Sequence, residues 1–157
     1  MDLLKEDPAI AHAKTLARST QLHEQWCASK GIGELGADAG REGSTALSRT
    51  ILAGGFESSI RWRAAESVGE LGESAGRDAA ASLAQALLSR KPGEPGQDVF
   101  VRSCAAGSLG KLGDACYGQG AEALAKSLRY DVSEQVRRRA AIALGELGAE
   151  AAGEDGQ

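Results

Sequence analysis

Residues 136–148 read VRRRAAIALGELG, and this stretch decides the fold. Its apolar side chains recur every three or four residues, which is the spacing of one face of an α-helix. The stretch ends in the motif Gly-x-Leu-Gly, which occurs four times in the chain. The four copies begin 36, 41 and 35 residues apart, at Gly33, Gly69, Gly110 and Gly145. Self-similarity at such a period is typical of repeat proteins, in which short helical units stack on one another.

The repeated unit is longer than the motif. Residues 9–36 align without a gap on residues 121–148, so each unit contains a second helical segment upstream. The longest interval holds an insertion at residues 91–96, KPGEPG, which its prolines and glycines predict to be a loop. We therefore expect each unit to be a helix B followed by a helix A. Within one domain, residues 1–157, the pairs are expected near 8–36, 39–72, 75–113 and 117–148, and residues 149–157 form a frayed tail.

Each motif carries two glycines with different expected roles. The second glycine is expected to end helix A, because a positive φ at that position favours glycine. The first lies inside the helix at a cost of about 1 kcal/mol relative to alanine. Its recurrence predicts that a neighbouring helix approaches closely there. At the start of the chain, Asp7 and Pro8 predict an N-cap and first residue for the first helix B.

The stretch 136–148 resembles the HEAT-like repeat named after phycobilisome lyases. The signature of that repeat is a Val-Arg pair, two alanines and then Ala-Leu-Gly-x-Leu-Gly. The copies that begin at Ile60 and Val101 resemble it nearly as well, and Asp131 matches an acidic residue that usually precedes it. The first copy departs from the signature with Glu24 and Gln25 in place of Val-Arg. The resemblance implies an all-α fold: a right-handed α-solenoid, HEAT-like or armadillo-type, of about four helical pairs.

In function, the resemblance implies a non-catalytic scaffold for protein–protein interaction, since the family serves mostly as binding scaffold. Two groups of enzymes are similar to the repeat. Deoxyhypusine hydroxylases hold two irons with several His-Glu pairs, whereas this chain has the single pair His23-Glu24, which cannot build such a site. Phycobilin lyases act on linear tetrapyrroles of light-harvesting proteins, and a lyase or isomerase subunit is the alternative function. No catalytic residue, metal or cofactor is predicted, because His23 and Cys27 lack a third group to orient them.

Two sets of residues are predicted to bind a partner. Trp26, Trp62 and Arg138 share one position on helix A that points away from helix B. We expect the two tryptophans on an outer ridge, about 10 Å apart as in adjacent stacked helices; the alternative is that each ring covers the small alanines of its own helix. Lys14, Arg49 and Lys126 share one outward position on helix B, and they either contact an acidic partner or are solvated.

Two alternative roles are open for the arginines that flank this outward position on helix A, which are Arg61, Arg63, Arg102, Arg137 and Arg139. Either they pair with an acidic residue of the adjacent repeat, for which Asp131 is a candidate, or they form a basic ridge for a partner.

Composition limits the classes of partner. The formal net charge of −4 argues against a protein built to grip phosphate backbones. The sequence has no uncharged apolar run of about 18 residues, and its first residues lack the layout of a secretory signal. Cys27, Cys104 and Cys116 have no ligand spacing and are expected to be free thiols. We therefore expect a protein partner, no nucleic acid and no membrane. The expected location is intracellular, cytoplasmic by default, or a plastid if an upstream segment is missing.

Overall fold

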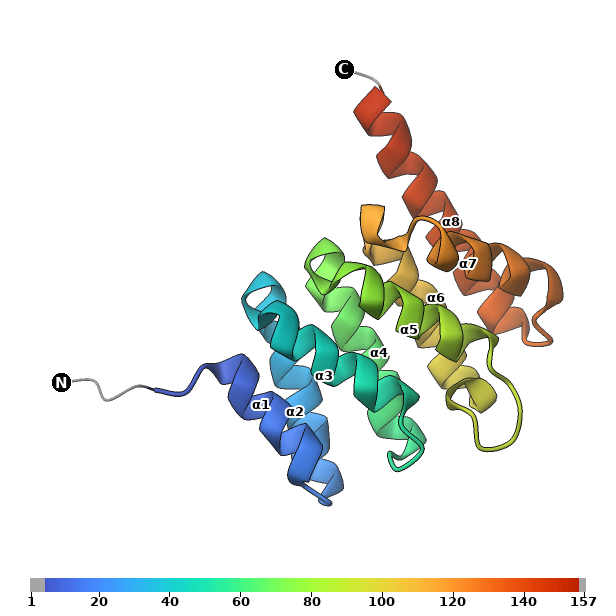
Figure 1. Ribbon diagram of the computed structural model, residues 1–157. Coiled ribbons are helices and arrows are strands. Elements are labelled where there is room, and N and C mark those ends of the chain that lie inside the picture. The colour runs from blue at the N-terminus through green and yellow to red at the C-terminus, as the bar shows by residue number, and fades with distance from the viewer. Residues whose placement is uncertain (1–4, 156–157) are drawn as a thin grey trace.

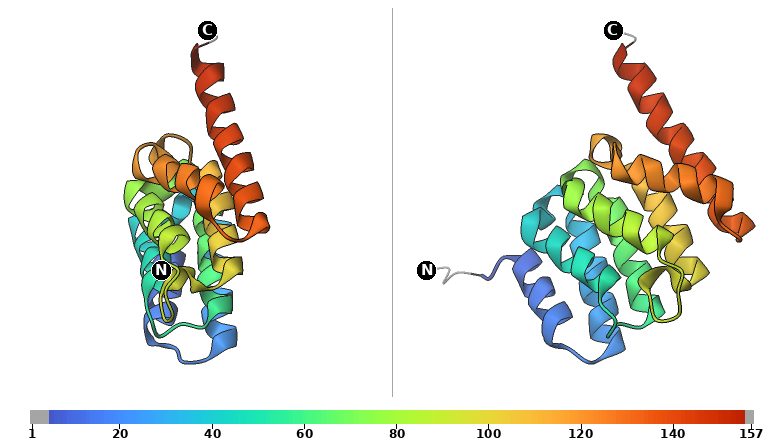
Figure 2. Two further views of the ribbon diagram at one scale, coloured as in Figure 1. Left: turned by 90° about the vertical axis from the view of Figure 1, so that its right-hand side faces the viewer. Right: turned by 45° about the vertical axis from the view of Figure 1, so that its right-hand side comes forward.

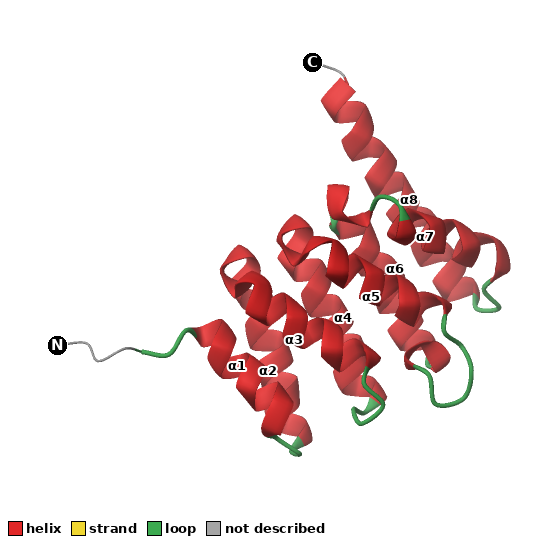
Figure 3. Cartoon of the chain, in the orientation of Figure 1, coloured by secondary structure: helices red, strands yellow, loops and turns green. Residues whose placement is uncertain are grey.

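A computed structural model of the protein describes residues 5–155, and within them the chain forms helices and turns without strands (Figure 3). The prediction of an all-α fold is confirmed. The α-helices are α1 (Pro8–Arg18), α2 (Leu22–Leu35), α3 (Gly40–Leu52), α4 (Ser58–Leu71), α5 (Gly76–Leu88), α6 (Val99–Lys111), α7 (Gln119–Tyr130) and α8 (Glu134–Asp155). Short 3-10 turns, η1 (Gly36–Ala39), η2 (Gly72–Ala75), η3 (Pro95–Gln97) and η4 (Gly113–Cys116), lie between some of them.

The helices stack in two layers (Figures 1 and 2). The odd-numbered helices, which are the B helices, pack side by side in chain order, and the even-numbered A helices do the same behind them. Each B helix also packs against the A helix that follows it. Every pair therefore contacts only its neighbours along the stack, which is the arrangement of an array of HEAT-like repeats.

The core lies between the two layers and is made of small and branched side chains. On the A helices Val136, Ala140 and Leu147, together with their equivalents in the second and third copies, are almost completely buried. Leu144, predicted on the same face, is only partly buried because it lies at the edge of this core. Asp7 caps α1, since its carboxylate accepts a hydrogen bond from the Ala9 N–H at 2.8 Å. The N-cap prediction is thus confirmed.

The first glycine of the motif is where adjacent A helices approach most closely. A Cβ atom at Gly110 would lie 2.7 Å from the Cα of Ala143 on α8, and one at Gly69 would lie 2.7 Å from the Ser108 hydroxyl on α6. Real Cβ contacts are essentially never that short. The close approach predicted from the repeated glycine is therefore confirmed at these interfaces.

The second glycine ends the A helix in three copies. Gly36, Gly72 and Gly113 have φ of 54°, 58° and 53°, a region that glycine enters without steric cost. The prediction that Gly148 also ends its helix is wrong, because α8 runs on to Asp155. In the first two copies a further positive-φ glycine, Gly40 or Gly76, follows four residues later. The last copy has alanine at that place, and the helix-favouring residues 149–152 continue α8, which ends at Asp155 instead of forming a frayed tail.

In the described range, every helix is too short or too polar to cross a lipid bilayer.

Candidate functional site

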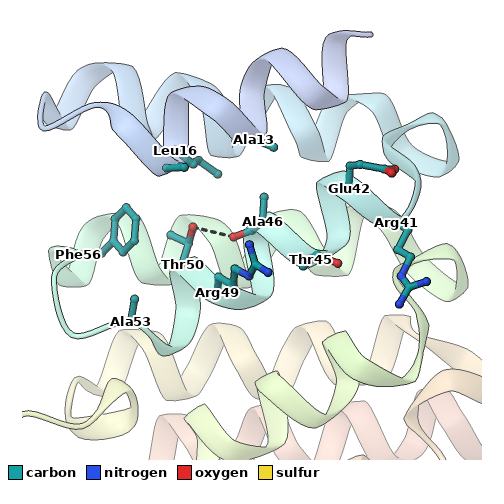
Figure 4. A pocket seen from close by; sticks show the side chains of 11 residues that line it. Ala13, Leu16, Arg41, Glu42, Thr45, Ala46, Arg49, Thr50, Ala53 and Phe56 are labelled. Atoms are coloured by element: carbon teal, nitrogen blue, oxygen red, sulfur yellow. Dashed lines mark hydrogen bonds between the residues drawn. The ribbon is translucent and has the colours of Figure 1, made fainter.

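Two adjoining grooves cross the layer of B helices. The first, here called the α1–α3 groove, has a volume of about 450 Å³ and lies between α1 and α3 beside the α3–α4 turn (Figure 4). Leu16 from α1 and Phe56 from the turn give it apolar walls, and small residues leave the space open. Its lining is Ala13, Leu16, Ala17, Arg41, Glu42, Thr45, Ala46, Arg49, Thr50, Ala53 and Phe56.

The second, here called the α3–α5 groove, has a volume of about 900 Å³ and lies on the other side of α3. It is rich in hydroxyl groups, but three of them are engaged: the Oγ atoms of Ser44, Ser74 and Ser82 donate hydrogen bonds to the carbonyls of Ala75, Leu71 and Asp78 at 2.6, 2.6 and 3.0 Å. Arg41 and Arg49 line both grooves, so the two form one continuous surface centred on α3. Its lining is Gly40, Arg41, Ser44, Thr45, Ser48, Arg49, Leu52, Ala53, Ser74, Ala75, Gly76, Arg77, Asp78 and Ser82.

Three arginines give this surface its charge. Arg41 and Arg49 extend from α3, as Figure 4 shows, and Arg77 extends from the first turn of α5. None of the three makes a side-chain hydrogen bond or ion pair with any residue in the range 5–155. By contrast Arg63 on the opposite layer is held by two glutamates, Glu66 at 3.1 Å and Glu70 at 2.6 Å. The guanidinium groups in the grooves are free to bind an acidic ligand.

Sequence reasoning found one of these arginines and missed two. Arg49 was predicted through its repeat position on helix B. Arg41 and Arg77 were not, although each directly follows a glycine with positive φ, Gly40 or Gly76. The recurring Gly-Arg pair at the start of α3 and α5 was the available signal, and it points both side chains into neighbouring grooves.

The other members of the predicted helix B file lie in different surroundings. The Lys14 ammonium is paired with the Glu6 carboxylate. Lys126 is paired with Glu122 at 2.9 Å along α7. Both lysine side chains remain half exposed. A partner role for these two residues stays a prediction, and the structure brings neither of them to the grooves.

The two tryptophans contact each other. The Trp26 and Trp62 rings meet edge to face, with centroids 5.0 Å apart and planes at 81°. The expected separation of about 10 Å is therefore wrong, because both side chains lean across the interface between α2 and α4. Both rings are partly buried, and Trp62 packs against the core. Arg138, at the same repeat position on α8, is exposed. Partner binding by these three residues remains a prediction.

The arginines of the Val-Arg pairs are structural. Arg102 bonds both oxygens of the Asp131 carboxylate, with Nε 3.0 Å from Oδ2 and Nη2 3.2 Å from Oδ1. The pair joins the third repeat to the fourth and is almost completely buried. Arg137 donates instead to the backbone carbonyls of Asp131 and Val132. Of the two alternatives, pairing across adjacent repeats is the one found for Arg102.

The three cysteines are free thiols in different surroundings. Burial raises the pKa of the Cys104 thiol to about 11, and Glu66 adds to that shift. Burial alone raises the pKa of Cys116 to about 11. Cys27 is exposed, and its sulfur lies 3.6 Å from the His23 Nε2. Within the part of the chain that the structure describes, no three or more His, Cys, Asp or Glu side chains gather as metal ligands would.

The fold defines a class: an all-α stack of helical pairs with neighbour contacts consistent with a HEAT-like repeat array. Residues 136–155 match the family model described as the PBS lyase HEAT-like repeat. The match covers the last A helix, α8, and confirms the resemblance inferred from the sequence for that copy. The sequence matches no curated protein.

Proposed function

We propose that the protein is a non-catalytic scaffold that binds an acidic segment of a partner protein in the α1–α3 and α3–α5 grooves. The observation that carries the proposal is the set of three arginines, Arg41, Arg49 and Arg77, which face these grooves without partners among the described residues. A guanidinium offers a planar fork of donors that matches a carboxylate.

The charge of the grooves supports an acidic ligand. The α3–α5 groove brings three arginines together with a single acidic residue, Asp78, although the protein as a whole has a formal net charge of −4. A basic surface on an acidic protein attracts acidic ligands and repels basic ones, which gives selectivity and a faster association rate.

The shape of the grooves supports an extended segment. Both lie between parallel-stacked helices and are joined across α3, so a chain that crosses α3 contacts both at once. Ala17 and Phe56 offer apolar contact in the α1–α3 groove, and the exposed Thr45 hydroxyl, which lines both grooves, offers a hydrogen bond. On such a surface the apolar contacts provide affinity, and the polar contacts fix the alignment of the bound segment along the grooves.

Selection from a library of displayed peptides tests the proposal, since it works with a partner of unknown identity. We expect the selected peptides to be enriched in Asp and Glu. Their affinity for Arg49→Glu is expected to fall about tenfold, which corresponds to roughly 1.4 kcal/mol. Arg129→Glu, which reverses an exposed arginine on α7 outside the grooves, is the matched control. Selected peptides without acidic enrichment, or equal loss in both variants, would contradict the proposal.

The lyase alternative has one observation in its favour. A linear tetrapyrrole carries propionate groups, and the α1–α3 groove pairs apolar walls with Arg41 and Arg49. Mixing the protein with a linear tetrapyrrole and recording the visible spectrum separates the two functions. A shift of the tetrapyrrole's visible band that is lost in Arg49→Glu would favour binding of a bilin. An unchanged spectrum would favour the scaffold function over the lyase alternative.

A further inference from the structure

A single row of exposed residues on α3 separates the two grooves. Arg41, Thr45 and Arg49 follow one another at intervals of four residues, so they share one side of the helix. All three line both grooves. Figure 4 shows the two arginines with their guanidinium groups extended from the helix. The row is therefore a ridge between the grooves that carries a positive charge toward each end.

The row is inclined to the axis of α3. With 3.6 residues per turn, each member lies about 40° further round the helix than the one before. From Arg41 to Arg49 this rotation runs toward Ala46, which lines only the α1–α3 groove, and away from Ser44, which lines only the α3–α5 groove. Arg41 thus lies toward α5, where Arg77 lines the same groove. A ligand that follows the row crosses α3 from the α3–α5 groove to the α1–α3 groove.

The length of the row determines the spacing of the charges that it binds. Arg41 and Arg49 are about 12 Å apart along α3, since a helix rises about 1.5 Å per residue. An extended peptide advances about 3.3 Å per residue, so four residues of it span about 13 Å, whereas two span about 7 Å and six about 20 Å. Residues four apart in an extended peptide also point to the same side. Acidic side chains at positions i and i+4 therefore reach both arginines at once.

We propose that the segment bound in the grooves is extended and carries two acidic residues four positions apart, an inference that rests on the scaffold function proposed above. One acidic residue contacts Arg41 and Arg77, and the other contacts Arg49. The residue midway between them lies over Thr45. The proposal thus specifies which acidic proteins the grooves accept, because charge alone would allow any spacing.

The two ends of the row differ in what surrounds them. Glu42 lines the α1–α3 groove and Asp78 lines the α3–α5 groove, and each lies in the first turn of its helix, close to the Arg41 end. Among the described lining residues, no carboxylate belongs to the later turns beside Arg49. The contact at Arg49 is therefore expected to contribute more of the affinity. Past Arg49 the half-buried Phe56 offers apolar contact to the next part of the ligand.

Peptides that differ only in the spacing of two glutamates test the proposal. In a serine–glycine background the glutamates are placed two, four, six or seven positions apart, and binding to the full chain is measured by fluorescence anisotropy. The spacing of four is expected to bind at least about fivefold more tightly than the others, and Arg49→Gln is expected to remove that advantage. Spacing seven is included because two residues seven apart on a helical ligand lie about 10.5 Å apart on one face.

The outcomes separate this proposal from the scaffold function. Equal affinity at all spacings, or tightest binding at seven, would overturn the extended i, i+4 pattern, while the scaffold function would stand if Arg49→Glu still weakens binding. Failure of every acidic peptide to bind would contradict the scaffold function and this proposal together.

Variants of Thr45 supply a second readout. A carboxylate at this position lies four residues from both Arg41 and Arg49, within reach of either, so Thr45→Glu competes with the ligand from within α3. Thr45→Gln adds a side chain of the same size without charge and is the matched control. We expect Thr45→Glu to weaken binding of the i, i+4 peptide at least about tenfold and Thr45→Gln less than about threefold. Since Thr45 is exposed, both variants are expected to fold, which thermal melts by circular dichroism check. Equal affinity of the two variants would overturn the proposal.

Discussion

Replacement of Arg102 by leucine should be among the most destabilising single changes on this protein's polar side chains. Arg102 is 5% exposed and Asp131 is 3% exposed, so the substitution leaves a buried carboxylate with only the Ser133 N–H at 2.9 Å and the more distant Arg90 guanidinium at 3.8 Å. It also frees the carbonyls of Gly96 and Gln97, which Arg102 now caps.

The magnitude follows from the cost of an unpaired buried charge. Breaking a buried ion pair by removing one partner costs about 3–5 kcal/mol, and the remaining donors place this case near the lower value. For a domain of this size 1 kcal/mol shifts the melting temperature by about 2–4 °C, so we expect a fall of roughly 6–12 °C. Circular dichroism is the assay, because both tryptophans lie in the first two repeats and would not report on this interface.

Two further variants separate the ion pair from simple loss of packing. Arg102→Leu combined with Asp131→Asn removes the unpaired charge and is expected to recover at least half of the lost stability. Arg61→Leu is the matched control, since Arg61 sits at the same repeat position and is also buried, yet it bonds only the Ala53 carbonyl at 2.9 Å and its Nε has no partner. Its loss should cost about 1 kcal/mol. Equal melting temperatures for Arg61→Leu and Arg102→Leu would refute the reasoning.

Two other predictions concern glycines and thiols. Gly148→Ala is expected to raise the free energy of unfolding by about 1 kcal/mol, because Gly148 lies within α8 in open space. Gly72→Ala is expected to lower it by about 1–3 kcal/mol, because φ is 58° and ψ is −139° at Gly72. Thermal melts should therefore shift in opposite directions for the two variants, and shifts of the same sign would contradict this reasoning. At pH 8 a thiol reagent is expected to modify Cys27 alone in the folded protein, as mass spectrometry would show. Since the pKa values of Cys104 and Cys116 are raised from 9.0 to about 11, the unfolded chain releases these protons first, so stability should fall as pH rises from 9 toward 11. A Cys104→Ala/Cys116→Ala variant should lose that dependence, and a wild-type melting temperature that stays constant over this range would contradict the pKa shifts.

The sequence predicted the parts of the fold that every repeat encodes in the same way. The spacing of apolar residues located the helical pairs, and the recurring Gly33, Gly69 and Gly110 predicted the close helix contacts. The end of α8 was predicted wrongly because the argument rested on one residue, Gly148, where helix termination depends on the residues that follow. In the last copy those residues favour a continued helix.

The candidate site could not be predicted to the same extent, because it depends on neighbours across the stack. Arg49 and Arg77 are far apart in the chain and meet only because α3 packs beside α5. The contact between Trp26 and Trp62 depends on rotamers that lean toward each other, which a helix backbone does not determine. Repeat position therefore predicts which layer a side chain occupies but not which partner it finds.

The glycine contacts between A helices also bear on how such a protein can change in length. Gly33 faces Ser67, and Gly69 faces Ser108 at the equivalent place on the next helix. If one helical pair were deleted, from residue 37 to residue 72, Gly33 would meet Ser108, which is the same side chain in the same position. The first two interfaces are thus interchangeable, and the unit between them could be lost in evolution while the joint stays the same.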